Sequence, residues 1–244
     1  MNRKRGRTTT LEVGPRVMVG AAAVVAVAAG AAILLSRGGL VPGGEDPVKA
    51  EAPIVAYEEG TGVTGDGDPY IGRPDAPVTV IEYGDYQCPN CRQFATEVLP
   101  WLRQTWLGRG FVRVVYRDFA IRGEASVRAA EAAHCAGEQG RYWSYHDAAF
   151  AAQGKADGEA YSRGVLLGIA SDLGLDTGAL AECLSSRRHQ SKVETSTQFG
   201  YGQGFEGTPT FIVNGRVTQG AIPIDRWNAL FQAYQAEFDS GQAP

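Results

Sequence analysis

The chain has 244 residues, enough for one sizeable domain with additional segments. Its hydrophobic content of 44% indicates a globular protein with a packed core. The formal net charge is −4, but the first 16 residues hold five basic residues and one acidic residue, so the rest of the chain carries −8. A domain this acidic excludes nucleic-acid binding by bulk electrostatics.

An uncharged apolar stretch, residues 17–35, follows the basic segment 1–16. As a helix it would be about 28 Å long, close to the thickness of a hydrocarbon core. The basic residues before it predict a cytoplasmic N-terminus and an extracytoplasmic catalytic domain, on a single-pass protein of the cell membrane. A cleaved signal peptide is the alternative, because Ala26-Val27-Ala28 is similar to a cleavage site; its place inside the apolar run favours an uncleaved anchor.

Residues 36–69 are rich in Gly, Pro, Glu and Asp, which predicts a disordered linker with a reach on the order of 30 Å. We expect the folded domain at residues 70–238, followed by a short tail at 239–244.

The first core strand is predicted at residues 78–83, where both faces are apolar as in a central parallel strand. Glu82 interrupts this pattern, and a buried carboxylate is costly without a role or a partner. It is either a strand-end side chain that reaches water or a buried proton acceptor.

The motif Cys88-Pro89-Asn90-Cys91 lies between this strand and a helical pattern at residues 92–106. Because proline is favoured at the first helical position, Cys88 is the predicted N-cap. Its sulfur then faces unpaired backbone N–H groups, which should hold its pKa below the free value of about 8.5. Half of a zinc site and an inert disulfide are the alternatives, but no second such pair exists in the sequence. The context favours thiol–disulfide exchange.

Pro100 should kink the helix, since proline lacks the N–H that bonds to the preceding turn. A second strand at residues 111–116 completes a strand–helix–strand unit, which implies parallel pairing. A helical insertion is predicted at about residues 122–200. It contains all three histidines, His134, His146 and His189, whose spacing fits packed or surface side chains better than metal ligands.

Cys135 and Cys183 lie on the apolar sides of two predicted insertion helices, 48 positions apart. In an exported protein they should form a structural disulfide that contributes roughly 2–4 kcal/mol. Two free buried thiols are the alternative.

Gly207-Thr208-Pro209-Thr210 leads into a third strand at residues 210–213. Asn214-Gly215 predicts a tight hairpin turn into residues 216–219. Apolar residues at helical spacing then predict a closing helix at residues 224–238.

This order of elements resembles the DsbA-like thiol:disulfide oxidoreductases of the thioredoxin superfamily. Three segments carry the resemblance: VTVIEYGDYQCPNC at 78–91, YWSYHDAAF at 142–150 and GTPTFIVNG at 207–215. It covers about residues 70–238. It implies an α/β thioredoxin fold with an inserted helical domain.

The resemblance also implies residue roles. Cys88 is similar to the attacking cysteine, Cys91 to the buried resolving cysteine and Glu82 to the buried acid. Pro209 is similar to the cis-proline that faces the disulfide; Thr208, Pro89 and Asn90 would form the substrate-binding surface. Strongly oxidising members have histidine where this chain has Asn90, so the resemblance leaves the redox potential open.

We therefore predict an extracytoplasmic oxidase that donates its Cys88–Cys91 disulfide to exported, cysteine-containing proteins and needs no cofactor. The resemblance implies a membrane quinone-linked partner, DsbB-like or vitamin-K-epoxide-reductase-like, that re-oxidises the pair. A disulfide reductase or isomerase of the same fold, and a non-catalytic peptide-binding or chaperone-like module, are the alternatives.

Overall fold

The computed structural model describes residues 58–153 and 161–241. The predicted basic segment, transmembrane anchor and most of the predicted linker lie outside these residues. Of the helices in the described part of the chain, none combines the length and the apolar character needed to cross a membrane.

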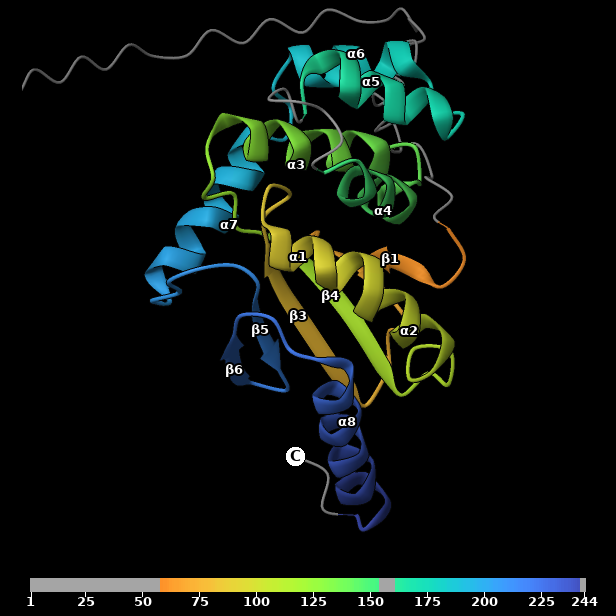
Figure 1. Ribbon diagram of the computed structural model, residues 1–244. Coiled ribbons are helices and arrows are strands. Elements are labelled where there is room, and N and C mark those ends of the chain that lie inside the picture. Colours follow the sequence, from red (N-terminus) through yellow and green to blue (C-terminus); the bar gives the residue numbers. More distant parts are fainter. Residues whose placement is uncertain (1–57, 154–160, 242–244) are drawn as a thin grey trace, which may run out of the picture. The chain divides into compact units, whose positions relative to one another are not determined.

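A mixed sheet of six strands, in the order β1-β2-β4-β3-β5-β6, forms the centre of the domain (Figure 1). Only β3 and β4 pair in parallel; every other neighbouring pair is antiparallel. The strands are β1 (Thr61–Val63), β2 (Pro69–Ile71), β3 (Val78–Gly84), β4 (Val112–Asp118), β5 (Thr210–Val213) and β6 (Arg216–Gln219).

Helices cover both faces of the sheet. On one face, Phe94 packs against Phe211 of β5 with the rings tilted, and Phe211 meets Trp227 of α8 (Ile224–Asp239) with ring centroids 5.0 Å apart. On the other face, Tyr83 of β3 packs against Phe199 of α7 (Gln190–Gly202). The alternating side chains of β3 therefore reach two separate cores, as its continuous apolar run predicted.

The helix that follows the cysteine motif is continuous but uneven. It begins as α1 (Pro89–Gln93), widens into a π-helical turn η1 (Phe94–Val98) and continues as α2 (Leu99–Gln104). The backbone N–H of Leu99 donates to the carbonyl of Phe94, directly before Pro100. The irregularity predicted from Pro100 thus takes the form of a wide turn, which tolerates the missing proline N–H.

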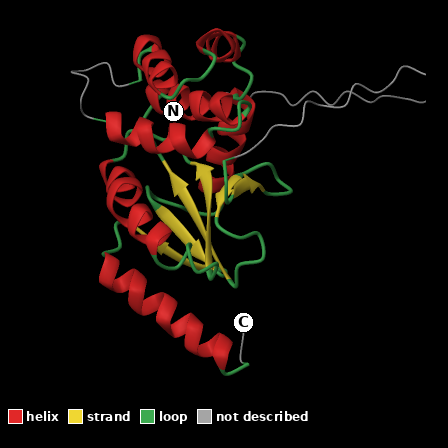
Figure 2. Ribbon diagram, turned by 90° about the vertical axis from the view of Figure 1, so that its right-hand side faces the viewer, coloured by secondary structure: helices red, strands yellow, loops and turns green. Residues whose placement is uncertain are grey.

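Four further helices come between β4 and α7, and they gather at the carboxyl ends of β3 and β4 (Figures 1 and 2). They are α3 (Glu124–Gly137), α4 (Tyr142–Ala152), α5 (Arg163–Asp172) and α6 (Thr177–Ser185). Cys135 of α3 and Cys183 of α6 are joined in a disulfide, with Cα atoms 6.0 Å apart. Small buried side chains on α3, among them Ala129, Ala132 and Ala133, let its neighbours approach closely.

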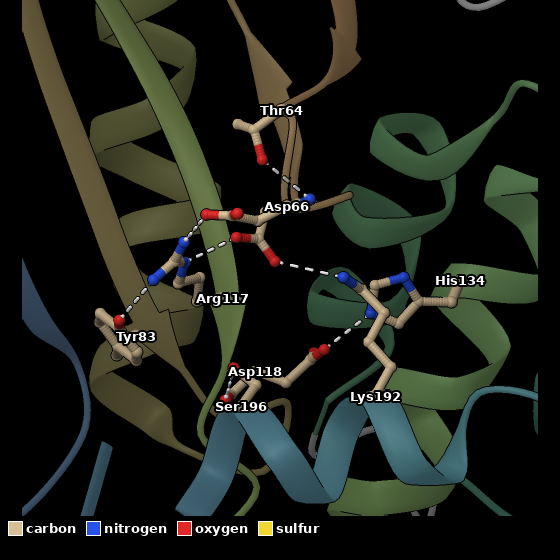
Figure 3. A network of polar contacts seen from close by, with 9 residues as sticks. Thr64, Asp66, Tyr83, Arg117, Asp118, His134, Lys192 and Ser196 are labelled. Carbon is tan, nitrogen blue, oxygen red and sulfur yellow. Dashed lines mark hydrogen bonds and ion pairs between the residues drawn. The ribbon is translucent and has the colours of Figure 1, made fainter. Parts of the chain in front are cut away.

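The linker predicted at residues 36–69 ends earlier than its composition indicated. Residues 61–63 pair with β2, and a polar network centred on Arg117 of β4 holds the turn that follows (Figure 3). The Arg117 guanidinium donates to Asp68 at 2.7 Å, to Asp66 at 3.1 Å and to the Tyr83 hydroxyl at 3.0 Å. Asp68 also binds Lys192 of α7 at 3.2 Å.

The predicted end of the linker at residue 69 was wrong because it was based on local composition. Acidic and glycine residues in sequence suggest a solvated chain. Here the carboxylates of Asp66 and Asp68 find cationic partners 49 to 124 positions away, which no local pattern reveals. Glu58 behaves likewise: its carboxylate accepts from the backbone N–H groups of Trp143 and Ser144 at the start of α4.

Candidate active site

Cys88 stands at the N-terminus of α1, in extended conformation and followed by Pro89 at the first helical position. Its carbonyl accepts from Arg92 N–H at 3.0 Å, which closes the first helical turn. The thiol Sγ donates to the carbonyl of Thr208 at 3.2 Å. Cys88 and Cys91 are both unpaired and buried, with exposed fractions of 1% and 0%.

The two thiols have opposite acidities. The pKa of Cys88 is lowered from 9.0 to about 5, mainly by a hydrogen bond from the Cys91 thiol. The backbone N–H groups of Cys91 and Asn90 also lower it, whereas burial raises it. Burial, the hydrogen bond to Cys88 and the nearby Glu82 raise the pKa of Cys91 well above its usual value. At neutral pH the pair therefore holds one thiolate, on Cys88, and one proton, on Cys91.

Glu82 lies deep in the sheet, with 1% of its surface exposed. Its cross-strand partners are Tyr116 of β4 and Phe211 of β5, so it has no route to water along the strand. Burial, and then the negative charge of Cys88, raise the pKa of Glu82 well above its usual value. Its Oε1 has no hydrogen-bond partner within the described residues. Glu82 is therefore buried and does not reach water, as the first of the two alternatives required; its role as a proton acceptor stays a prediction.

The peptide bond between Thr208 and Pro209 is cis. Pro209 is buried, whereas Pro89 and Asn90 are exposed at the mouth of the site. A small groove runs beside them, with Phe94, Pro209 and Ile222 in its wall. The structure therefore brings the six residues of Cys88–Cys91 and Thr208–Pro209 together with Glu82, although the two segments are more than 115 positions apart.

Asp85 is a site residue that the sequence reasoning missed. Its buried carboxylate accepts four hydrogen bonds, which join the loop before Cys88 to the start of α3. The donors are Gln87 N–H at 2.7 Å, Ser126 Oγ–H at 2.6 Å, Ile121 N–H at 2.8 Å and Arg122 N–H at 2.9 Å. The only local signal was an acidic residue directly after a buried strand.

The helical insertion supplies two more contacts to the same loop. Gln153 donates through Nε2 to the carbonyls of Tyr86 and Cys88, at 2.5 and 3.1 Å. The Tyr161 hydroxyl lies 2.8 Å from the carbonyl of Tyr86. The insertion therefore helps to hold the backbone that carries the attacking cysteine.

In the described ranges, one trio has its ligand atoms close enough for a metal ion: Cys135, Cys183 and His189. The two sulfurs of this trio are bonded to each other, so only one imidazole can act as a ligand. His134 is paired with Asp118 at 2.7 Å, and His146 is fully buried in α4.

A Cys-Pro-x-Cys pair at a helix N-terminus, a cis-proline opposite it and a helical insertion between β4 and β5 define the DsbA-like class of thioredoxin-fold disulfide oxidoreductases. The family model described as thioredoxin matches residues 64–233, and the chain belongs to this family.

Individual relatives agree with this class. The chain is 29% identical to Disulfide bond formation protein D of Bacillus subtilis, over 65% of this chain and 73% of that protein. The oxidised crystal structure of BdbD from Bacillus subtilis superposes with a TM-score of 0.64 at 26% identity, covering 73% of this chain and 96% of the other. A Na(+)/H(+) antiporter NhaA 1 of Salinispora arenicola is 37% identical over 67% of this chain, which spans 24% of the antiporter's length.

Proposed function

We propose that the protein is an extracytoplasmic thiol:disulfide oxidoreductase that donates a Cys88–Cys91 disulfide to cysteine pairs of exported proteins. The observation that carries the proposal is the unequal acidity of the two buried thiols, one thiolate at a helix N-terminus beside one protonated thiol. A stabilised Cys88 thiolate is a good leaving group, which favours release of the reduced enzyme.

In the oxidised enzyme, a substrate thiolate attacks the Cys88 sulfur and the Cys88–Cys91 bond breaks. Cys91 leaves with the electron pair and takes up a proton. A second substrate thiolate then attacks the substrate sulfur of the mixed disulfide, so the substrate gains a disulfide and Cys88 leaves as a thiolate. Two electrons pass from the substrate to the enzyme, and Cys88 needs no proton because its pKa of about 5 keeps it ionised.

Glu82 is the proposed proton donor to Cys91 in this direction and its proton acceptor when the pair is re-oxidised. Its position next to Cys91 is supported by the raised pKa of that thiol, to which the Glu82 carboxylate contributes. Because burial raises the pKa of Glu82 itself, the carboxyl group holds a proton under conditions where an exposed glutamate would not.

Substrate chains are proposed to bind at the mouth of the site, across Thr208, Pro89 and Asn90. The Thr208 carbonyl oxygen lies 3.2 Å from the Cys88 sulfur, so a substrate segment bound beside Thr208 would lie alongside the reacting sulfur. Phe94, Pro209 and Ile222 form an apolar surface beside the mouth of the site, against which a substrate chain would pack.

The proposed location is the outer face of the cell membrane, with residues 17–35 as the anchor and a quinone-linked membrane protein as the re-oxidant. The name of the Bacillus relative, a disulfide bond formation protein, supports the oxidising direction over reduction or isomerisation.

The decisive experiment uses the Cys91→Ala variant. Its Cys88 thiolate attacks a substrate disulfide, the reverse of the last step above, and without Cys91 no internal thiol displaces the substrate from the mixed disulfide. Expressed with its N-terminal segment, the variant should accumulate adducts with exported proteins that dissociate on reduction, and Cys88→Ala should accumulate none. If Cys88→Ala retained the full cellular activity, a binding module without turnover would explain the protein better.

A further inference from the structure

Two backbone carbonyls of the loop that carries Cys88 depend on side chains of the helical insertion. No backbone N–H group of the described residues donates to the carbonyl of the buried Tyr86. Its donors are Gln153 Nε2 at 2.5 Å and the Tyr161 hydroxyl at 2.8 Å. The carbonyl of Cys88 accepts from Arg92 N–H and also from Gln153 Nε2, at 3.1 Å. Because a buried carbonyl without a donor costs free energy, the insertion satisfies groups that the loop does not satisfy by itself.

Gln153 is placed for these contacts by the end of α4. Its backbone N–H donates to the carbonyl of Phe150, and its own backbone then leaves the helical conformation, with φ −56° and ψ 128°. Its side chain meets the two carbonyl oxygens of the loop. Since a carbonyl oxygen only accepts, the end of the amide that faces both oxygens is the NH₂ group, which has two N–H donors. One side chain therefore binds both carbonyls at once.

Tyr161 reaches the same loop from a backbone conformation that is rare for a bulky residue. Its φ is +67°, in the left-handed region, and such conformations persist where the surrounding contacts compensate for them. The side chain is buried, and its hydroxyl oxygen lies 2.8 Å from the carbonyl of Tyr86 and 3.0 Å from that of Ala149. Tyr161 thus ties α4 to the loop before the cysteine motif.

Tyr86 is held through its ring as well. The ring stacks on Phe150 of α4 with centroids 4.6 Å apart, so the insertion fixes this residue at both its side chain and its carbonyl. Two residues further on, the Cys88 sulfur accepts hydrogen bonds from the backbone N–H groups of Asn90 and Cys91. Whether the sulfur stays over these groups depends on the direction of the backbone that enters the helix.

We propose that Gln153 and Tyr161 are positioning residues for disulfide exchange. They hold the backbone of residues 86–88 so that the Cys88 sulfur stays over the N-terminus of α1, and they thereby make the cysteine pair more oxidising. This inference rests on the proposed function and deepens it. In the reduced enzyme hydrogen bonds alone keep the thiolate in place, whereas in the oxidised enzyme the bond to Cys91 holds the sulfur. Loss of the positioning contacts therefore destabilises the reduced form more than the oxidised form.

The titratable groups around the motif keep their own contacts when these two residues are changed. Glu82 is enclosed by β4 and β5, and the carboxylate of Asp85 is bound from residues 121–126. Burial raises the pKa of Tyr161 above its usual value, so its hydroxyl is a neutral donor throughout the pH range of the experiment. A change in the Cys88 thiol is then attributable to the lost contacts.

Two substitutions test the proposal. Gln153→Met keeps the length of the side chain and removes both donors, and Tyr161→Phe removes only the hydroxyl. Each leaves Cys88, Cys91 and their neighbours in the motif unchanged.

Matched controls delete bonds of the same kind elsewhere in the insertion. Gln139→Met removes an amide whose Nε2 donates to the carbonyl of Asp176 at 3.2 Å. Tyr145→Phe removes a hydroxyl that donates to the carbonyl of Leu166 at 2.9 Å. Neither bond reaches the motif loop, so the controls report the effect of weakening the insertion alone.

Three quantities are measured on the full chain. The first is the pKa of Cys88, from the ultraviolet absorbance of its thiolate. The second is the equilibrium with glutathione, in which one glutathione disulfide oxidises the Cys88–Cys91 dithiol and two glutathione thiols form. The third is the stopped-flow rate of disulfide transfer to a two-cysteine peptide.

In Gln153→Met and Tyr161→Phe we expect the glutathione equilibrium to shift about two- to tenfold towards the oxidised protein, the range for loss of one net hydrogen bond. The pKa of Cys88 should rise by up to about one unit, which is the same factor expressed as acidity. Transfer should slow by a similar factor, because a less stable thiolate is a poorer leaving group. Both controls should match the wild type in all three quantities, even where their unfolding free energy falls.

An unchanged Cys88 pKa and glutathione equilibrium in both variants would overturn the proposal, because the contacts would then serve folding only. Equal shifts in the controls would also overturn it. If Tyr161→Phe fails to fold, Gln153→Met decides alone, since its side chain lies half-buried at the end of a helix. Failure of the wild type to oxidise the peptide would contradict the proposed function instead, and the pKa comparison would still test the positioning.

Discussion

The acidity of Cys88 gives the sharpest test, because it fixes how oxidising the pair can be. A pKa of about 5 leaves roughly 1% of the thiol protonated at pH 7. Thioredoxin, with a cysteine pKa near 7 and a potential of about −270 mV, is a suitable reference. If thiolate stabilisation alone separates the two proteins, the reduced form gains a factor of about 50, and the potential rises to about −220 mV at 30 mV per tenfold.

The same shift predicts a dependence of stability on pH. The folded pKa of Cys88 is depressed below its unfolded value, so the thiolate stabilises the reduced protein above pH 5, and this stabilisation is lost as the pH falls through about 5. At pH 7 it amounts to about 3 kcal/mol, from two pKa units at about 1.4 kcal/mol each. The oxidised protein has no thiolate, so it should lack this stabilisation and its dependence on pH.

The assay is the ultraviolet absorbance of the thiolate in the reduced protein, titrated with the oxidised protein as the blank, together with equilibration against glutathione. Cys91→Ala is the matched variant. It removes the hydrogen bond that contributes most to the low pKa, so its Cys88 should titrate at higher pH. A wild-type midpoint near the free value of about 8.5, or a potential at or below about −270 mV, would refute the reasoning and favour a reductase.

Three further variants test the parts around the cysteines. Because the folded pKa of Glu82 is raised, its carboxylate costs stability as the pH rises above the unfolded value of 4.5. In denaturant titrations, the gain in unfolding free energy of Glu82→Gln over the wild type should therefore be larger at pH 8 than at pH 4, and the variant should be slower in the step in which Cys91 leaves and takes up a proton. Replacing both Cys135 and Cys183 by alanine should lower the unfolding free energy by about 2–4 kcal/mol and leave the transfer rate unchanged; a slower rate would indicate a relay between the two pairs. In Asp85→Asn the side-chain NH₂ group faces two of the four hydrogen-bond donors, so we expect the unfolding free energy to fall by about 2–3 kcal/mol. An unchanged melting temperature would mean that other contacts hold the loop.

The sequence predicted the features that depend on local pattern. Cys88 is the N-cap because Pro89 follows it. The strand at 78–83 is buried on both faces because apolar residues occupy both sides of the strand. Each of these follows from neighbours within a few positions.

Apart from the Cys135–Cys183 disulfide, contacts between distant polar residues were not predicted. Nothing near Asp85 indicates its bonds to Ile121 and Ser126, and nothing near Asp68 indicates Arg117 or Lys192. The same limit applies to His146: its helical spacing gives a packed histidine, but only the fold places its ring beside Tyr116. Single-sequence patterns describe a residue's own element and not the side chains that pack across it.

The bonds from Gln153 and Tyr161 to the carbonyls of Tyr86 and Cys88 have a consequence for protein engineering. Trimming the chain to its strands and flanking helices would leave the Tyr86 carbonyl without its two side-chain donors and the Cys88 carbonyl with the Arg92 N–H alone. A minimal redox module made in this way would then need new donors at these carbonyls, supplied by a redesigned loop. Transplanting the Cys-Pro-Asn-Cys segment into another scaffold faces the same requirement, so the unit to transfer is the motif together with α4, Gln153 and Tyr161.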